Sequence, residues 1–282
     1  MISVLIPSYN RSFFLKEAIQ SVLNQDYFKN HSFSDSCELI VIDDGSTDNT
    51  RDVVKSFGSS VKYHYENHKG VSAVRNIGLE VSTGDYVAYL DSDDLWKKDK
   101  LSVQMNFMEA FPDAMVCYTE ETWIRRGVFV NPKKKHRKYS RWIFDKVLPL
   151  CLLSLSSALF RKGVFEVIGN FDESLPACED YDLGIRLAHK YPVHLIPKPL
   201  IIKRGGHPDQ LSQSFWGMDR FRVNALQKAL LLDLTPHQEA LVKQEITKKC
   251  LILANGFKKR QKEHEARKYL ELLDKYKLKE ES

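Results

Sequence analysis

Residues 39–46 have the sequence LIVIDDGS, in which four apolar residues are followed at once by two aspartates, a glycine and a serine. A short apolar run bounded by turn residues is typical of a strand that is buried on both faces. Similar runs occur at residues 4–6, 61–65 and 86–90, and between them apolar residues recur at helical spacing, first between Leu15 and Leu23. Alternating strands and helices predict a parallel sheet with helices on both faces.

The pattern changes further along the chain. From Met218 onward apolar residues recur only at helical spacing, with charged residues between them. The middle of the chain is mixed, with strands expected at residues 115–118, 157–160 and 194–196 and helices at 164–168 and 182–189. We therefore expect an α/β fold with a Rossmann-like, mostly parallel sheet over residues 1–215, followed by a C-terminal helical extension over 216–282.

The composition is that of an ordinary globular protein, since 43% of the 282 residues are apolar and 28% are charged. A net charge of +5 does not by itself imply a nucleic-acid partner, and we expect none. The five cysteines lie at neither metal-ligand nor redox-motif spacing, which favours reduced thiols. No apolar stretch is long enough to span a bilayer, and the apolar N-terminus lacks the basic start of a signal peptide. These features predict a cytoplasmic protein.

The densest basic run is KKKHRK at residues 133–138. A solvated loop is the favoured interpretation of such a run. The alternative is contact with anionic lipid headgroups at the inner face of a membrane, or with a charged acceptor.

Polar clusters follow three of the expected strands: PSYN at residues 7–10, DDGS at 43–46 and DSDD at 91–94. In a parallel sheet these strand ends lie on one edge, where ligands bind. Five carboxylates on one edge repel one another unless a cation or a hydrogen-bonding ligand lies between them. Carboxylate oxygens are the ligands that Mg²⁺ and Mn²⁺ prefer. Helix capping explains one or two of these aspartates but not their repetition at 91–94.

Phosphate-binding glycine motifs are absent from the sequence, so a bound diphosphate would need a metal and basic side chains. Lys69 and Arg75 flank the turn after the third strand and are candidates, although charges that merely solvate a helix start fit equally well. Glu179 and Asp180 open an expected helix, where the helix dipole favours acidic residues. The sequence RGGHPDQ at residues 204–210 suggests a mobile loop.

Four stretches resemble, in order, the motifs of the family 2 glycosyltransferases: VLIPSYNR at 4–11, ELIVIDDGSTD at 38–48, GVSAVRNIG at 70–78 and DSDDLW at 91–96. The resemblance covers residues 3–105 and resumes at 160–187. It implies a GT-A fold and an inverting transfer of a sugar from a nucleoside diphosphate sugar, with a UDP-sugar expected. It also implies a Mn²⁺ or Mg²⁺ cofactor.

The resemblance further implies roles for individual residues. The donor site would contain Pro7, Tyr9, Asn10, Asp43, Lys69, Arg75, Asp91 and Ser92, with Asp43 accepting from the base. Asp93 would be the direct metal ligand. Asp91 would contact the ribose or the water shell of the metal, and His207 would be a further ligand to the metal or the diphosphate. Asp180 would be the general base, with Glu179 beside it.

Several alternatives stay open. The acceptor is a saccharide, a lipid-linked oligosaccharide or a protein, as in the synthesis of a surface polysaccharide or glycoconjugate. The helical extension packs on the domain, pairs two chains into a homodimer or touches a membrane, and packing is favoured. A non-catalytic nucleotide- or sugar-binding module is a second interpretation. A phosphatase using Asp91-Ser92-Asp93 is a third, although Leu95 stands where such enzymes need a hydroxyl residue.

Overall fold

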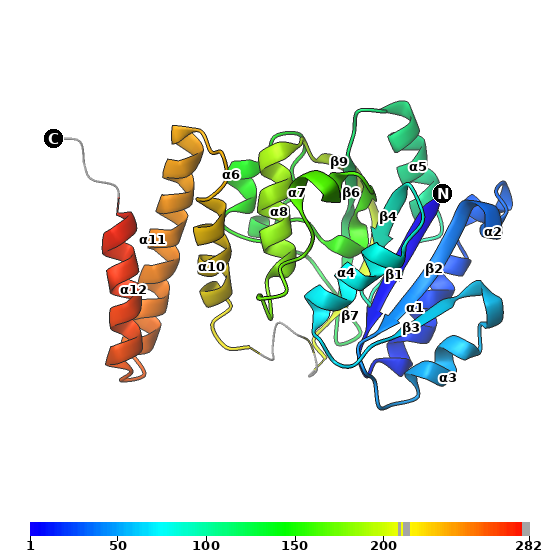
Figure 1. Ribbon diagram of the computed structural model, residues 1–282, viewed down its shortest axis with the longest axis horizontal. Coiled ribbons are helices and arrows are strands. Elements are labelled where there is room, and N and C mark those ends of the chain that lie inside the picture. Colours follow the sequence, from blue (N-terminus) through cyan, green and yellow to red (C-terminus); the bar gives the residue numbers. More distant parts are fainter. Residues whose placement is uncertain (208–209, 211–214, 278–282) are drawn as a thin grey trace.

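The computed structural model describes residues 1–207, 210 and 215–277, and its centre is one mixed sheet (Figure 1). The described strands are β1 (Ile2–Ser8), β2 (Cys37–Asp43), β3 (Lys62–Tyr65), β4 (Tyr86–Tyr89), β5 (Leu95–Trp96), β6 (Val116–Arg125), β7 (Val128–Val130), β8 (Leu159–Arg161) and β9 (His194–Gly205). Their order is β3-β2-β1-β4-β8-β6-β9-β5, with β7 paired to β6. The first four strands in this order pair in parallel, as do β6 and β9, whereas the other pairs are antiparallel. The expected α/β fold is confirmed, with its parallel pairing concentrated in the N-terminal half.

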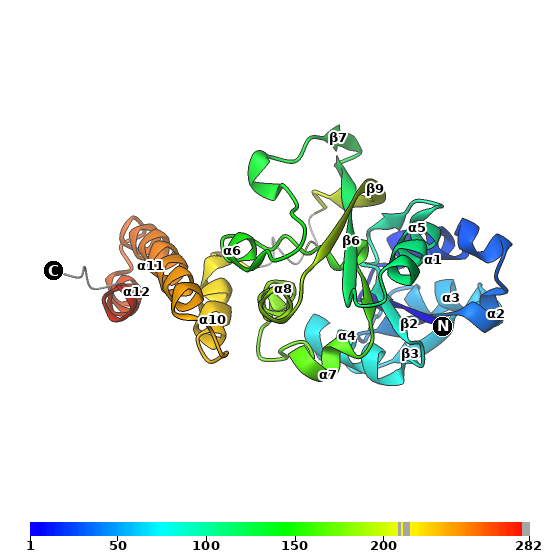
Figure 2. The ribbon, with the colours of Figure 1, turned by 90° about the horizontal axis from the view of Figure 1, so that it is seen from above.

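Helices cover both faces of this sheet (Figure 2). The described α-helices are α1 (Ser12–Leu23), α2 (Phe33–Ser36), α3 (Thr50–Lys55), α4 (Val71–Val81), α5 (Lys100–Ala110), α6 (Phe144–Val147), α7 (Val164–Ile168), α8 (Glu179–Lys190), α10 (Asp219–Ala229), α11 (Pro236–Lys258) and α12 (Glu263–Tyr276). Short 3₁₀ turns lie at Asp26–Lys29, Gly58–Ser60, Lys134–His136 and Leu155–Ser157.

Strand β1 shows why the apolar runs form buried strands. Successive side chains of a strand point to opposite faces of the sheet. Leu5 joins the hydrophobic cluster that contains Val74 of α4, whereas Val4 and Ile6 join the cluster that contains Leu15 of α1. Because helices bury both faces, the strand interior is apolar except for Ser3, whose hydroxyl donates to Glu38 (2.5 Å), and a polar cluster follows where the strand ends.

Helix α4 approaches this sheet closely because it contains Gly78. A Cβ atom at Gly78 would lie 2.9 Å from the Cδ1 atom of Ile42 in β2. The helix starts after Gly70, whose φ of 94° is favourable only for glycine. This docking places Arg75, on the first turns of α4, beside the carboxyl ends of the strands.

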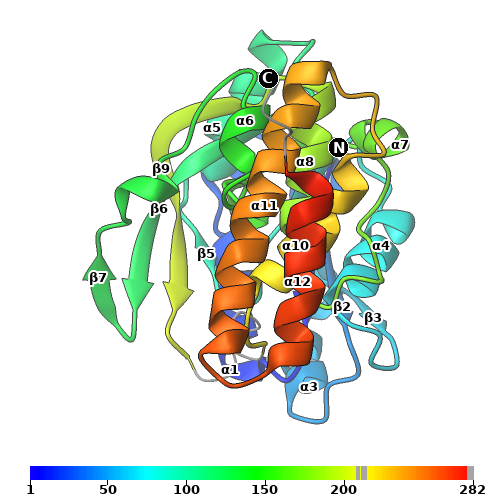
Figure 3. The same cartoon turned by 90° about the vertical axis from the view of Figure 1, so that its left-hand side faces the viewer.

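The three C-terminal helices form a layer at the end of the molecule farthest from β3 (Figures 1 and 3). Thr235 and Gln238 form a capping box at the start of α11, which fixes where that helix begins. Leu226 of α10 and Ile246 of α11 belong to the same hydrophobic cluster as Leu183 of α8, so the extension packs on the domain as favoured. The division at 215/216 stays a prediction. Within the described residues, no helix combines the length and apolarity needed to cross a membrane.

The basic run at residues 133–138 differs from a solvated loop at its last residue. Lys138 is only 8% exposed. Its ammonium donates to the carbonyl of Thr119 (2.7 Å), to Oε1 of Glu121 (2.6 Å) and to the hydroxyl of Ser157 (3.2 Å). The prediction of a solvated lysine is wrong at this position, because a buried carboxylate and two further acceptors take the place of water.

Candidate functional site at the carboxyl edge of the sheet

Asp43 ends β2 and is buried at the edge of the parallel strands. One carboxylate oxygen accepts from the backbone N–H of Ser46 (2.9 Å), and the other accepts from the hydroxyl of Tyr63 (2.6 Å). Burial and the neighbouring Asp43 carboxylate raise the pKa of Tyr63, which keeps that phenol a donor. Asp43 therefore has a fixed orientation at the point where the resemblance places the nucleobase.

The loop after β1 is joined to the loop after β2 through Asn10. This residue has a φ of 50°, and its side-chain oxygen accepts from the backbone N–H of Thr47 (2.8 Å). Its neighbour Tyr9 is 45% exposed and stacks on His68 with ring centroids 4.3 Å apart. Pro7, half-buried in β1, pairs with Ile42 in the sheet. These contacts leave an open aromatic surface at the sheet edge.

Asp44 has a structural role. The sequence motifs had placed it with Asp43 as a strand-end carboxylate and did not show that the two side chains differ in function. Its carboxylate accepts from the backbone N–H groups of Lys69 (2.7 Å) and Gly70 (3.1 Å), which fixes the turn before α4. The side chain of Lys69 is half-exposed and its ammonium lies 2.7 Å from a Glu66 oxygen. Lys69 is thus at the expected edge, held by a carboxylate of the protein.

Arg75 joins three parts of the chain. Its guanidinium donates to Oδ1 of Asp91 (2.8 Å) and to Oε1 of Glu179 on α8, and it is 5% exposed. Burial lowers the pKa of Arg75, but the charges of Asp91, Glu179 and Asp180 more than offset this effect and raise it overall. The sequence predicted that Arg75 contacts the donor. In the structure both terminal nitrogens are occupied by carboxylates of the protein, and the sequence had not indicated this link.

Glu179 and Asp180 form the start of α8, directly after Cys178 with its φ of 67°. Burial raises the pKa of Glu179 to about 7, the charge of Asp180 adds to this effect, and Arg75 opposes it. Asp180 is half-buried and accepts from the backbone N–H of Tyr181 (2.7 Å). Its neighbour Glu179 is joined through Arg75 to Asp91, so Asp180 belongs to the same region as the strand ends.

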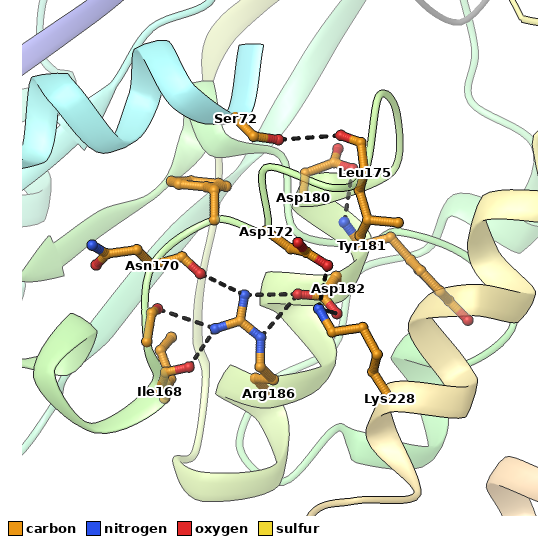
Figure 4. A network of polar contacts seen from close by, with 12 residues as sticks. Ser72, Ile168, Asn170, Asp172, Leu175, Asp180, Tyr181, Asp182, Arg186 and Lys228 are labelled. Carbon is orange, nitrogen blue, oxygen red and sulfur yellow. Dashed lines mark hydrogen bonds and ion pairs between the residues drawn. The ribbon is translucent and has the colours of Figure 1, made fainter. Parts of the chain in front are cut away.

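A network of polar contacts holds the segment before α8 in place (Figure 4). Ser72 of α4 donates to the carbonyl of Leu175 (3.3 Å), which fixes the loop just before Glu179. Arg186 donates to Asp182 of the same helix (2.7 Å), and Lys228 of α10 lies 3.2 Å from Asp182. The helical extension therefore helps to position the candidate base, a role that the sequence did not indicate.

Asp93 and His207, both named as metal ligands by the resemblance, lie together. Oδ2 of Asp93 is 3.1 Å from Nε2 of His207 and accepts from Arg11 (2.8 Å). Asp91 points to Arg75 instead, and Ser92 is buried. Part of the expected loop at 204–210 falls outside the described residues, since positions 208 and 209 are not covered.

Within the described part of the chain, no three histidine, cysteine, aspartate or glutamate side chains are arranged to hold a metal ion. Asp93 and His207 nevertheless fit a divalent cation as two of its ligands. A carboxylate and an imidazole are suitable donors for Mn²⁺, and the two side chains already meet at one point.

Asp94 has a different role from its neighbour. It is buried and accepts from the backbone N–H of Arg204 on β9 (3.0 Å). Burial and the charge of Asp93 raise the pKa of Asp94 well above its ordinary value. Arg204 in turn donates to the carbonyl of Asp93. This pair fastens the end of β9 to the loop that carries Asp91 and Asp93.

Comparison with known proteins places these features in a family. The model of the glycosyl transferase family 2 matches residues 3–169, more than half of the chain. Escherichia coli WfaP, named a UDP-Glc:alpha-D-GlcNAc-diphosphoundecaprenol beta-1,3-glucosyltransferase, is 30% identical over 196 residues, which are 67% of this chain and 71% of WfaP. Bacillus subtilis TuaG, named a putative teichuronic acid biosynthesis glycosyltransferase, is 39% identical over 112 residues, which are 38% and 42% of the two chains. Matches to two uncharacterized glycosyltransferases of Rickettsia felis and Rickettsia conorii span 40% of the length of those relatives.

Solved structures show the same fold. Residues 1–349 of Staphylococcus aureus TarS, in complex with UDP-GlcNAc, superpose with a TM-score of 0.78 at 19% identity, covering 98% of this chain and 80% of that one. The mannosyltransferase PcManGT of Pyrobaculum calidifontis, in complex with GDP-Man and Mn²⁺, gives a TM-score of 0.63 at 19% identity, covering 100% and 88%. The expected GT-A fold is confirmed. With this fold and a family match over more than half of its length, the chain belongs to glycosyl transferase family 2.

Proposed function

We propose that this protein transfers a sugar, with inversion, from a nucleoside diphosphate sugar to an acceptor hydroxyl in the synthesis of a surface polysaccharide or glycoconjugate. One observation carries the proposal. Arg75 joins Asp91, at the end of β4, to Glu179, which is adjacent to Asp180 at the start of α8. A strand-end carboxylate and a candidate base are thereby brought to one place in a chain of this family.

A UDP-sugar is the expected donor. WfaP is named as a user of UDP-Glc, and TarS was solved with UDP-GlcNAc. The exposed ring of Tyr9 offers a stacking surface for a base, and the fixed carboxylate of Asp43 offers an acceptor for its N–H group. Pro7 and Asn10 would shape this pocket, while Lys69, Arg75, Asp91 and Ser92 would line the ribose and phosphate side.

Asp93 and His207 would hold a Mn²⁺ or Mg²⁺ ion, with Asp91 nearby. When bound, such an ion supplies positive charge that offsets the charge developing on the diphosphate leaving group. Arg11 already donates to Asp93, so it would share that carboxylate with the ion. The complex of PcManGT with GDP-Man and Mn²⁺ supports this expectation by analogy of fold.

Asp180 would accept the proton of the acceptor hydroxyl as it attacks the sugar. A general base must reach the proton that it removes, and the half-buried carboxylate of Asp180 is held in one orientation by the backbone N–H of Tyr181. Glu179 has a different task, because it is buried and paired with Arg75. Glu179 would hold the guanidinium of Arg75 between its own carboxylate and that of Asp91.

A screen of UDP-Glc, UDP-GlcNAc and GDP-Man by thermal shift, with and without Mn²⁺, tests the donor. A matching donor at a hundred times its Kd should stabilise the fold by about 2.7 kcal/mol, and the effect should need the metal. NMR of the product of the matching donor should then show an inverted anomeric centre. A retained centre would contradict inversion, and donor binding with no transfer to any acceptor would favour a non-catalytic module. Hydrolysis of a generic phosphate ester would favour the phosphatase interpretation.

A further inference from the structure

A cavity of about 430 Å³ lies beside the candidate site, outside the region assigned to the donor. Its walls are the end of β6, the segment 130–136 after β7, and the end of β9. Figure 2 shows this segment arching away from the sheet before the chain returns to α6. The cavity is large enough for a sugar unit, since ligand pockets typically measure several hundred cubic ångströms.

The described lining of this cavity is strongly positive. It contains five cations, Arg125, Lys133, Lys135, Lys203 and Arg204, and neither aspartate nor glutamate, while burial and the neighbouring lysines lower the pKa of His136 and favour its neutral form. Arg125, Lys133 and Lys135 are exposed, and none of them forms an ion pair with any other residue in the described ranges. Lys203 and Arg204 are balanced by Glu121 and Glu17, whereas the three exposed cations are not, and unpaired cations that converge on a concave surface favour an anionic ligand.

The cavity also has an aromatic wall. The ring of Trp123 lies 5.0 Å from that of His136, and its indole N–H donates to Oε2 of Glu121 (2.7 Å), which fixes its orientation. An indole provides a flat apolar surface with low conformational freedom, which suits the apolar face of a sugar ring. The combination of Trp123 with the surrounding cations fits a saccharide that carries a negative charge.

Residues of the cavity wall contact the candidate site directly. The backbone N–H of Arg204 donates to Asp94, and its guanidinium donates to the carbonyl of Asp93. A ligand in the cavity would therefore lie beside the loop that carries Asp91 and Asp93. Arg75 joins Asp91 to Glu179, the residue before the proposed base.

We propose that this cavity is an acceptor subsite for an anionic saccharide, one that carries a carboxylate or a phosphate group. The inference rests on the proposed function and deepens it by naming the acceptor class. Lys133, Lys135 and Arg125 bind the charged group, and Trp123 packs against the sugar ring. The donor would bind at the edge of the parallel strands, which Tyr9 and Asp43 mark and which is not part of the cavity lining.

Binding of defined oligomers to the whole chain, saturated with UDP and Mn²⁺, tests this assignment by calorimetry. The probes are hexagalacturonate for carboxylates, a glycerol phosphate hexamer for phosphodiesters and maltohexaose as a neutral control. At least one anionic oligomer should bind ten times more tightly than maltohexaose, should weaken as NaCl rises from 50 to 500 mM, and should shift the NMR signal of the Trp123 indole N–H. The tighter anionic probe identifies the charged group.

A pair of matched variants locates the binding. Lys133→Ala with Lys135→Ala should weaken anionic binding at least tenfold and leave UDP affinity unchanged. Lys258→Ala with Lys259→Ala removes the same charge from exposed positions at the end of α11. This control should change neither the affinity for the anionic oligomers nor the affinity for UDP.

The inference fails if maltohexaose binds as well as the anionic probes, if the first variant binds them normally, or if only phosphatidylglycerol vesicles bind. If the protein binds UDP but neither anionic oligomer, the acceptor assignment is wrong and the proposed function stands. If the protein does not bind UDP, the result counts against the proposed function.

Discussion

The two halves of the sheet carry charge in different places. In β3, β2, β1 and β4 the candidate site carboxylates stand at the strand ends, as Asp43 does, or in the loop just beyond, as Asp91 and Asp93 do. In the other half, charges lie within the strands themselves. Glu121 of β6 pairs with Lys138 at 2.6 Å, and their side chains are only 4% and 6% exposed. Apart from the Glu38–Lys62 pair at the start of β2 and β3, the parallel half thus carries its charges at one edge, whereas the mixed half uses buried charges to hold its own chain.

The pairing of β6 with β9 shows how the second half accommodates such charges. The register between these strands shifts on both sides of Glu120, directly before Glu121. Irregularities of this kind redirect side chains and are frequent next to active sites. The parallel strands β1 and β2 pair without such a shift. The comparison predicts that substitutions at the parallel edge impair activity, whereas substitutions in the buried pair impair folding.

The largest effect on activity is expected from Asp180→Asn. Removal of a general base typically slows a reaction by about 10² to 10⁴-fold, so transfer should fall by that amount while donor affinity is retained. Asp113→Asn, at an exposed position in the loop after α5, serves as the control. Full activity of the Asp180 variant would show that another group accepts the proton.

Lys138→Met should impair stability and reveal the buried pair. The substitution removes the ammonium that donates to the buried Glu121 carboxylate and leaves only the charge of Lys203 and the indole N–H of Trp123, which should lower the free energy of unfolding by about 3 kcal/mol. Urea denaturation measures this loss. Lys134→Met changes an exposed residue of the same loop and should stay within about 0.5 kcal/mol of the unsubstituted protein. If the two variants are equally stable, the buried Glu121–Lys138 pair does not stabilise the mixed half of the sheet, and the contrast with the parallel half is lost.

Asp93→Ala tests the metal at the parallel edge. The tightening of UDP binding by Mn²⁺ should fall on the order of tenfold or more, because even outer-shell substitutions in metal sites cost ten- to a hundredfold. Calorimetry with and without Mn²⁺ measures the change, and the exposed Asp145→Ala is the control. A metal effect that survives in the Asp93 variant would place the ion elsewhere.

The smallest effect is expected at the start of the parallel strands, where Glu38 of β2 is buried. Burial raises its pKa, but hydrogen bonds from Lys62, Ser3 and Thr83 more than offset this and lower it to about 2. Because the folded pKa is below the ordinary value of 4.5, the contribution of Glu38 to stability is present above pH 4.5 and is lost as the pH falls toward 2. Glu38→Gln should flatten the dependence of the urea midpoint on pH in this window, whereas the exposed Glu80→Gln should not. An unchanged slope for Glu38→Gln would contradict the assignment.

Local pattern was sufficient to predict the parallel strands and the polar clusters that follow them. The apolar run before Asp43 and the helical spacing from Leu15 are properties of short segments, and burial on both faces demands them. The position of Lys138 could not be predicted in this way. A lysine in a basic run has the pattern of a solvated loop, and only the fold supplies the carboxylate and carbonyl that bury it.

The sequence by itself determined the fold class, the family and the edge of the sheet where a donor would bind, because each depends on residues that are close together in the chain. Only the tertiary structure decided which of those residues meet. Arg75 and Glu179 are 104 positions apart, and Asp93 and His207 are 114 apart. Periodicity carries no information over such separations, because these contacts depend on how α4, α8 and β9 dock on the sheet.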